Sequence, residues 1–372
     1  MKLKELASYL DSAVPLSFQE DYDNSGLQVG QPGKEVTSAL ISLDVTGQVI
    51  DEAIAAGCDV IIAHHPLIFH PIKRLTDFSE NERIIVKAIK KDIAIYSAHT
   101  NLDMFSGGVS KKMAEILKLK DTRVLTPMKG KLLKLVVYIP EASLDKVRKA
   151  VFDAGAGVAG NYDSCGYVVS GTGSFRGNET TNPFVGEKGK LHFEKEARFE
   201  TILFSHLKDK VVKAMIEAHP YEEVAYDLYS VENINTDTGL GRVGRLPVPV
   251  SVNEFLKLVS KKFSVRGLRY SGRVNRKISV VALCGGAGGQ MIKDAIGIGA
   301  DAFVSADIRY HSFFEAEEKI LIVDIGHYES EKPSVEILYD LIIKKFPTFA
   351  VRFSEINTNP INYFKDGKSK NT

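Results

Sequence analysis

VIDEAIAAGCDVIIAHHP, residues 49–66, is the stretch that decides the fold. Its first part has the apolar spacing of a helix that faces a core, and its second part, DVIIA, is a continuous apolar run typical of a buried parallel strand. The run ends on two adjacent histidines, His64 and His65. Polar side chains at the carboxyl end of such a strand mark the edge where parallel α/β sheets usually place their sites.

The same pattern returns near the C-terminus. MIKDAIGIGADAFVSADI, residues 291–308, aligns with residues 49–66 at a shift of 242. Identical residues stand at the aligned pairs Ile50/Ile292, Ala53/Ala295, Ile54/Ile296, Gly57/Gly299 and Asp59/Asp301. The next strands align at a shift of 228, which places His99 on His327 and Asp103 on Glu331. A matched unit beside a matched His-x-x-x-acid element predicts a duplicated α/β core, although similar spacing also arises by chance in β-α-β proteins.

Alternating strands and helices are expected in both halves. The first half should have strands at 38–45, 58–65 and 93–99 and helices at 46–57, 81–92 and 106–119. The second half should have strands at 277–285, 301–307 and 319–326 and helices at 289–300 and 334–346. Continuous Val/Ile runs between helices predict mostly parallel sheets.

A different segment lies between the halves. Strands are expected at 132–139, 166–177, 198–204 and 223–230, with helices at 143–155 and 209–219 and a Gly- and Asn-rich loop at 177–190. This βαββαβ order is that of the ferredoxin-like α+β unit. We therefore predict a discontinuous α/β core, residues 1–124 and 237–372, with a ferredoxin-like domain inserted at 125–236.

Composition excludes several classes of protein. The 372 residues carry a net charge of +1, which gives no overall electrostatic footprint for nucleic acid. No apolar run is long enough to span a bilayer, and the N-terminal helix pattern with its acidic residues is not that of a signal peptide. The cysteines, Cys58, Cys165 and Cys284, are scattered and form no CxxC pair, which suits a reducing cytosol. A cytoplasmic protein without a membrane partner is expected.

The candidate site is a set of polar residues that follow predicted strands. The set comprises His64, His65, His99, Asp103, Asp307, His311, His327 and Glu331. Imidazole together with carboxylate suits zinc, iron, manganese or nickel, and acids between two groups of histidines could bridge a pair of ions. The competing interpretation is a set of ordinary capped or solvated strand-end histidines.

Several weaker motifs suit ordinary structural roles. His70 should lie in a connecting loop, and GGAGG at 285–289 suits a tight strand-to-helix turn at least as well as a phosphate-binding turn. HPYEEVAYD at 219–227 suits a helix end running into an edge strand. Since proline is tolerated only near a helix start, Pro333 predicts that His327 lies in a loop and Glu331 near the first turn. The tail at 365–372 should be disordered.

Eight motifs occur in an order that resembles one known family. They are EDYDNSGLQVG (20–30), SLDVT (42–46), AHHPLIFHP (63–71), AHTNLD (98–103), GLGRVG (239–244), CGGAGG (284–289), SADIRYH (305–311) and DIGHYESE (324–331). Together they closely resemble the NGG-one-interacting-factor-three-like family, whose bacterial members are often labelled GTP cyclohydrolase I type 2 homologues. One small departure is Tyr22, where many members have Trp.

The resemblance implies a duplicated α/β fold, a homohexameric ring and a dinuclear metal centre. The implied ligands of two divalent ions per chain, zinc first with iron or manganese as alternatives, are His64, His65, Asp103, His327 and Glu331. His99 and Asp307 become supporting candidates. The insert looks similar to the trimeric folds of the PII signalling and divalent-cation-tolerance proteins.

Two hypotheses about function follow. In the first, the protein is a hydrolase that uses a metal-activated water, with His99 as a proton shuttle. In the second, it is a non-catalytic, metal-dependent regulatory or scaffold ring that uses metal for structure or sensing and whose insert receives a small-molecule or protein signal. No guanine-recognition motif is found in the sequence. Nucleic acid threading through a ring is disfavoured by the near-neutral charge.

Overall fold

The computed structural model describes residues 1–271 and 277–364, and its chain divides into two compact units. Unit 1 comprises Met1–Thr126 and the chain from Asp237 onward, and unit 2 comprises Pro127–Thr236. The expectation for the tail at 365–372 concerns residues outside the described ranges. Among the described residues, no helix combines the length and the apolar character needed to cross a bilayer.

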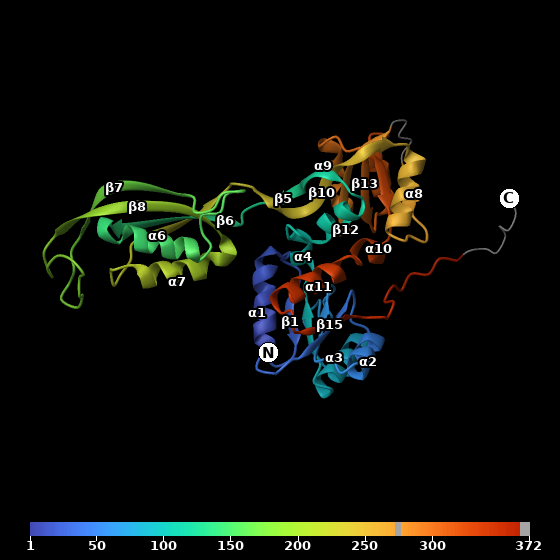
Figure 1. Ribbon diagram of the computed structural model, residues 1–372, viewed down its shortest axis with the longest axis horizontal. Coiled ribbons are helices and arrows are strands. Elements are labelled where there is room, and N and C mark those ends of the chain that lie inside the picture. The colour runs from blue at the N-terminus through green and yellow to red at the C-terminus, as the bar shows by residue number, and fades with distance from the viewer. Residues whose placement is uncertain (272–276, 365–372) are drawn as a thin grey trace. The chain divides into compact units, whose positions relative to one another are not determined.

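The first sheet of unit 1 has the strand order β1-β4-β3-β2-β15. Its strands are β1 (Gly26–Val29), β2 (Ser38–Ser42), β3 (Val60–Ala63), β4 (Ala94–Ser97) and β15 (Ala350–Phe353). All run parallel except β1, which pairs antiparallel with β4. The C-terminal strand completes the sheet of the N-terminal half, as the red β15 beside the blue strands shows in Figure 1.

Helices cover both faces of this sheet. They include α1 (Leu3–Ala13), α2 (Gly47–Ala55), α3 (Glu80–Lys90) and α11 (Ser334–Lys345). Successive β2 residues face opposite ways: Ile41 packs in the cluster that includes α1 and α11, and Leu40 packs in the cluster that includes α2 and α3. Burial on both faces explains why the strands read as continuous apolar runs.

The second sheet of unit 1 has the order β11-β14-β13-β12-β10-β5. Its strands are β5 (Lys120–Met128), β10 (Asn235–Val250), β11 (Arg269–Tyr270), β12 (Ile278–Ala287), β13 (Ala302–Ala306) and β14 (Leu321–Asp324). β12, β13 and β14 are parallel, whereas β10 and β11 pair antiparallel with β12 and β14. The remaining helices of this unit are α4 (Thr100–Met104), α5 (Val109–Ile116), α8 (Val252–Lys262), α9 (Ile292–Gly297) and α10 (His327–Glu331). Three short 3-10 helices are η1 (Leu16–Phe18), η4 (Gly289–Met291) and η5 (Tyr310–Ala316).

Asp59 and Asp301, which align in the sequence, accept equivalent backbone hydrogen bonds in the two sheets. Oδ2 of Asp59 accepts hydrogen bonds from the backbone N–H of Thr37 at 2.6 Å and of Ser38 at 3.2 Å. Oδ2 of Asp301 accepts from the N–H of Ser279 and of Val280, both at 2.9 Å. Each carboxylate therefore caps the beginning of the neighbouring parallel strand.

Unit 2 has the element order β6 (Leu132–Pro140), α6 (Leu144–Asp153), β7 (Gly166–Phe175), β8 (His192–Phe204), α7 (Lys208–Ala218) and β9 (Tyr226–Val231), with 3-10 turns η2 (Glu141–Ser143) and η3 (Ser205–Leu207). The strand order is β7-β8-β6-β9, and every pairing is antiparallel. Leu135 and Val137 of β6 pack with Val147 of α6 and Met215 of α7, which forms the core of this unit. The other face of the sheet carries charged side chains, including the Lys134–Glu200 pair.

Three expectations about elements need correction. The strand expected at 198–204 begins at His192, because β8 continues to pair with β7 as far as Phe175. The helix expected at 289–300 is split into η4 and the short α9. The expectation that His327 lies in a loop is wrong, because α10 spans His327–Glu331. Pro333 does not limit α10, since it stands at the N-cap of the next helix, α11.

Candidate metal centre

The carboxyl ends of four parallel strands in unit 1 bring the candidate residues together. His64 and His65 follow β3 directly, and His99 follows β4 as the N-cap of α4. Asp307 follows β13, and His327 begins α10 after β14. The ring centroids of His65 and His327 lie 5.2 Å apart, although 262 positions separate the two residues in the chain. The two halves of unit 1 thus meet at this site.

The carboxylate of Glu331 is the centre of the cluster. Its Oε2 lies 2.7 Å from Nε2 of His65 and 2.8 Å from Nε2 of His327. The same oxygen lies 3.8 Å from Nε2 of His64. Glu331 is 2% exposed and His64 is 0% exposed, so solvent does not compete for these atoms. His64, His65 and Glu331 offer ligand atoms that all lie within 4.8 Å of one another.

The outer nitrogen of each imidazole is held by an acceptor. Nδ1 of His64 lies 2.8 Å from the carbonyl oxygen of Ala98, which can only accept, so Nδ1 carries the proton and Nε2 turns its lone pair to the cluster. Nδ1 of His65 is 2.7 Å from Asp44, and Nδ1 of His327 is 2.8 Å from Asp307. Acceptors on the outer nitrogen are the arrangement that orients metal-binding histidines.

Two buried atoms in the cluster have no hydrogen-bond partner. They are Nε2 of His64 and Oδ1 of Asp103, which lie 3.9 Å apart. That separation is too long for a hydrogen bond, but it is of the order expected between two ligands that each lie about 2.0–2.2 Å from one ion. Because unpaired buried polar atoms are costly, these two atoms are candidates to share a cation as ligands.

The electrostatics of the cluster show how the carboxylate charge is balanced. Burial opposes protonation of His65, but hydrogen bonds to Asp44 and Glu331 outweigh it and raise the pKa of His65 to about 10. Burial is likewise outweighed at His327, where Glu331 and Asp307 raise the pKa to about 9. Burial raises the pKa of Asp103. The charge of Glu331 thus favours protons on both histidines, and a divalent cation at this position would compete with those protons.

The GGAGG turn supports the cluster and is not a phosphate cradle. The N–H of Gly286 donates to Oγ of Ser330 at 2.9 Å, and the N–H of Gly288 donates to Oγ of Ser305 at 3.0 Å. These donors are therefore already used. Gly286 has φ +63°, and a Cβ there would lie 2.1 Å from Oε1 of Glu331. The glycine thus leaves room for the central carboxylate.

His99 lies beside the cluster and has an acidic partner of its own. Its ring centroid is 5.4 Å from that of His64 and 5.5 Å from that of His65. Nδ1 of His99 is 2.8 Å from Oδ1 of Asp23, whose pKa is lowered because hydrogen bonds from His99 and Thr100 outweigh its burial. His70 is exposed in the loop after β3, and His311 lies on η5 with its ring against Tyr310, so neither joins the cluster.

Sequence reasoning missed three supporting residues. Asp44 and Asp23 stand inside two of the quoted motifs, SLDVT and EDYDNSGLQVG, and their carboxyl groups were the available signal. Thr358 gave none. It belongs to residues 354–364, here called the C-terminal strap, and its Oγ1 donates to Oδ2 of Asp44 at 2.5 Å. The strap also reaches α10, where Nδ2 of Asn359 donates to Oε1 of Glu329 at 3.2 Å.

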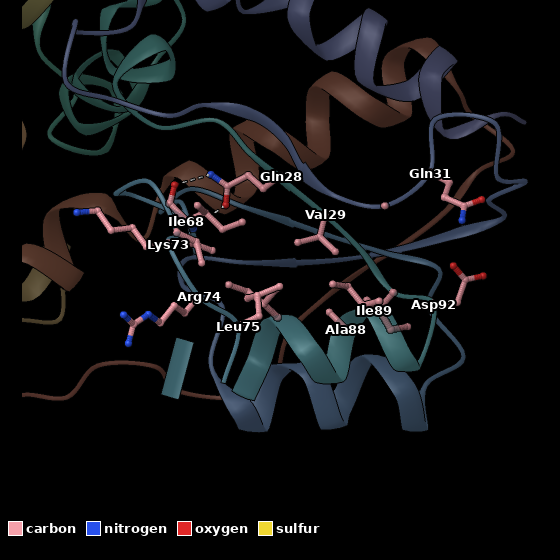
Figure 2. A pocket seen from close by; sticks show the side chains of 14 residues that line it. Gln28, Val29, Gln31, Ile68, Lys73, Arg74, Leu75, Ala88, Ile89 and Asp92 are labelled. Atoms are coloured by element: carbon pink, nitrogen blue, oxygen red, sulfur yellow. Dashed lines mark hydrogen bonds between the residues drawn. The ribbon is translucent and has the colours of Figure 1, made fainter. Parts of the chain in front are cut away.

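A groove of about 680 Å³ lies away from this cluster, between β1, the loop after β3 and α3. Figure 2 shows Lys73 and Arg74 at one end of it, Asp92 at the other and apolar side chains such as Val29 and Ile89 between them. Among the described residues, the histidines of the cluster are not part of its lining.

The comparisons with known proteins agree over nearly the whole chain. The family described as Duf34/NIF3 (NGG1p interacting factor 3) matches residues 1–360. The chain belongs to the Duf34/NIF3 family. Among its curated relatives is a Halalkalibacterium halodurans protein named GTP cyclohydrolase 1 type 2 homolog, 42% identical over 94% of this chain and 95% of the relative.

Two further members of the Duf34/NIF3 family match to a similar extent. A Bacillus subtilis protein of the same name is 39% identical over 97% of this chain and 98% of the relative. A Bacillus cereus crystal structure described as related to NIF3 shares 40% identity with a TM-score of 0.84, covering 98% of this chain and 99% of that one. This chain therefore has the mixed α/β fold of the family.

Proposed function

We propose that this protein holds two divalent metal ions at His64, His65, Asp103, His327 and Glu331 and is a metal-dependent hydrolase. The observation that carries the proposal is the buried pair of unpartnered atoms, Nε2 of His64 and Oδ1 of Asp103, on one side of the Glu331 carboxylate. Imidazole nitrogens and carboxylate oxygens suit zinc first, with iron or manganese as alternatives.

The chain's own residues would orient and protect such a centre. Ala98, Asp44 and Asp307 hold the outer nitrogens of the three imidazoles, so the inner nitrogens keep one direction. Five protein ligands do not saturate two ions, which leaves positions for water or substrate. Bound divalent metal supplies Lewis acidity and lowers the pKa of water to near neutrality.

Proton transfer is the role that the geometry offers to His99. Its ring stands beside those of His64 and His65, and Asp23 holds its Nδ1 at 2.8 Å. Because Asp23 occupies Nδ1, Nε2 is the ring nitrogen of His99 that remains to accept and return a proton. His99→Gln is therefore expected to keep the metal and lose turnover.

Metal content of the purified protein is the first measurement. Elemental analysis should find close to two divalent ions per chain in the wild type and few in the His64→Ala/His65→Ala double variant. His70→Ala is the matched control, because His70 is an exposed histidine of the following loop and should leave the content unchanged. A wild type without metal even after reconstitution would contradict the proposal.

Turnover is tested separately on the metal-loaded protein. The substrates to screen are phosphoesters, nucleotides and cyclic amides, and GTP belongs in the panel because the H. halodurans and B. subtilis relatives are named GTP cyclohydrolase 1 type 2 homolog. A fully loaded wild type that is inactive on every class would reject the hydrolase and leave the metal centre standing.

The second candidate function is a regulatory or scaffold ring without turnover. A cavity in unit 2, described below, favours a sensing role for that unit. The family resemblance further leads us to propose a homohexamer in the cytoplasm, for which light scattering coupled to size exclusion is the test. Mass that corresponds to a monomer would reject the ring.

A further inference from the structure

We propose that unit 2 binds a small organic cation of the alkylammonium class. The site is a cavity of about 260 Å³ near the end of the β7–β8 hairpin and the segment that follows α7. The residues that carry the argument are Phe175, Phe184, Glu196, Tyr221, Glu222 and Glu223. None of them belongs to the proposed metal centre, so this cavity can be tested separately from the metal-dependent hydrolase.

A buried carboxylate lies in the wall of this cavity. Glu196 on β8 is 8% exposed, and Oη of Tyr221 donates to its Oε1 at 3.0 Å. Among the described residues, no lysine, arginine or histidine nitrogen forms an ion pair with Glu196. Buried carboxylates are normally paired with a positive charge, and here a ligand would supply that charge.

The neighbouring strand is built to accommodate the carboxylate. Glu196 lies opposite Gly171 of β7, and its side chain extends over Gly173. A Cβ at Gly173 would lie 2.0 Å from Oε2 of Glu196, so any larger residue would displace the carboxylate. Burial and the hydrogen bond to Glu196 raise the pKa of Tyr221, so the phenol remains the donor and Glu196 the acceptor.

Three aromatic rings line the same cavity as the carboxylate. The ring of Tyr221 lies 5.9 Å from that of Phe175 and 6.3 Å from that of Phe184, measured between centroids. The faces of such rings attract cations, and proteins recognise quaternary ammonium ligands with groups of aromatic rings. The lining contains one positive side chain, Arg176, and three carboxylates, those of Glu196, Glu222 and Glu223. The lining therefore favours a positively charged ligand.

The same features argue against other ligands. A metal ion needs several ligand atoms within reach, and among the described residues the His/Cys/Asp/Glu group with that spacing is His64, His65 and Glu331. An anion would meet the three carboxylates, and a neutral molecule would leave the charge of Glu196 uncompensated. The volume is below the usual range of about 300–1,000 Å³, which limits the ligand to a few heavy atoms.

Calorimetric titration of the full-length protein with choline tests the proposal, with 3,3-dimethyl-1-butanol as the neutral probe of the same shape. Choline should bind saturably, and the alcohol should bind at least tenfold more weakly. Glu196→Gln keeps the side-chain volume and the contact with Tyr221, and it should weaken choline binding at least tenfold. Phe184→Ala should weaken it as well, because one aromatic wall is lost.

Glu200→Gln is the matched control. Glu200 lies on the same strand and face but pairs with Lys134 and Arg198, so choline binding should be unchanged. Equal binding by wild type and Glu196→Gln would overturn the proposal, as would the absence of saturable choline binding. A third outcome would also overturn the proposal: the wild type does not bind choline, and Glu196→Gln has a different oligomeric mass. The positive partner of Glu196 would then come from a second copy of the chain.

Discussion

Gly286 is the residue whose substitution should damage the proposed metal centre most selectively. Gly286→Ala would place a Cβ 2.1 Å from Oε1 of Glu331 at a backbone φ of +63°. The carboxylate must move, so we expect at least tenfold weaker metal binding, as for other losses of ligand support. Metal affinity measured by competition with a chromophoric chelator checks this.

Gly299 provides the comparison for that variant. It also has a positive φ, +74°, but a Cβ there meets nothing within 4 Å. Gly299→Ala should therefore cost about 1 kcal/mol through backbone strain and leave metal affinity unchanged. Equal metal affinity in the two variants would contradict this prediction, because moving the Glu331 carboxylate would then not affect the metal.

The C-terminal strap is an element that contacts the proposed metal centre through Asp44. Thr358 donates to Asp44, and Asp44 holds Nδ1 of His65 at 2.7 Å. Thr358→Val should weaken metal binding by roughly three- to tenfold, less than the loss of a direct support. Metal affinity is again the measurement, and thermal unfolding of the metal-free protein should change little.

Ser354→Ala separates support of the site from general attachment of the strap. Oγ of Ser354 donates to Oε2 of Glu52 on α2 at 2.5 Å, away from the cluster. This variant should leave metal affinity at the wild-type value. If Ser354→Ala lowers metal affinity as much as Thr358→Val does, the contact between Thr358 and Asp44 is not what supports metal binding.

The strand-capping aspartates make a prediction about stability and pH. The pKa of Asp59 is lowered because hydrogen bonds from Thr37 and Ser38 outweigh burial. A lowered pKa contributes stability above the unfolded value of about 3.9 and loses it as pH falls through the folded value. Asp59→Asn should therefore reduce the free energy of unfolding by about 1 kcal/mol at pH 7, and the difference should shrink below pH 4.

Asp301→Asn tests the equivalence of the two halves. Because Asp301 accepts two backbone N–H groups as Asp59 does, its loss at pH 7 should be of similar size. Urea unfolding of both variants gives the comparison. A large loss in one and none in the other would show that the aligned positions are not equivalent in the fold.

The division into units leads to a prediction about the complete chain. All five proposed ligands lie in unit 1, and the chain leaves and re-enters that unit through β5 and β10, neighbours in one sheet. Replacing residues 127–236 with a short Gly-Ser linker should keep both metal content and any turnover. Choline binding should disappear, because its cavity is removed. A folded core without metal would show that unit 2 contributes to the centre.

The apolar runs that end on polar residues were enough to predict where the candidate residues gather. His64, His65 and His327 are found where their strands end, because the carboxyl ends of parallel strands share an edge. The five residues implied by the family resemblance lie together in the structure, although their role as ligands stays a prediction. The βαββαβ order of the middle segment was also readable, since each of its strands and helices has its own periodicity.

By itself, the sequence determined the periodic elements, the alignment of Asp59 in one half with Asp301 in the other, and the polar residues at the strand ends. Each of these depends on local spacing. The tertiary structure alone decided which groups support them. Asp44 reaches His65 across 21 positions, Asp23 reaches His99 across 76, and Thr358 reaches Asp44 across 314. A hydrogen bond depends on distance and direction in space, and no local pattern encodes partners that only the packed sheets and the returning C-terminal strap bring together.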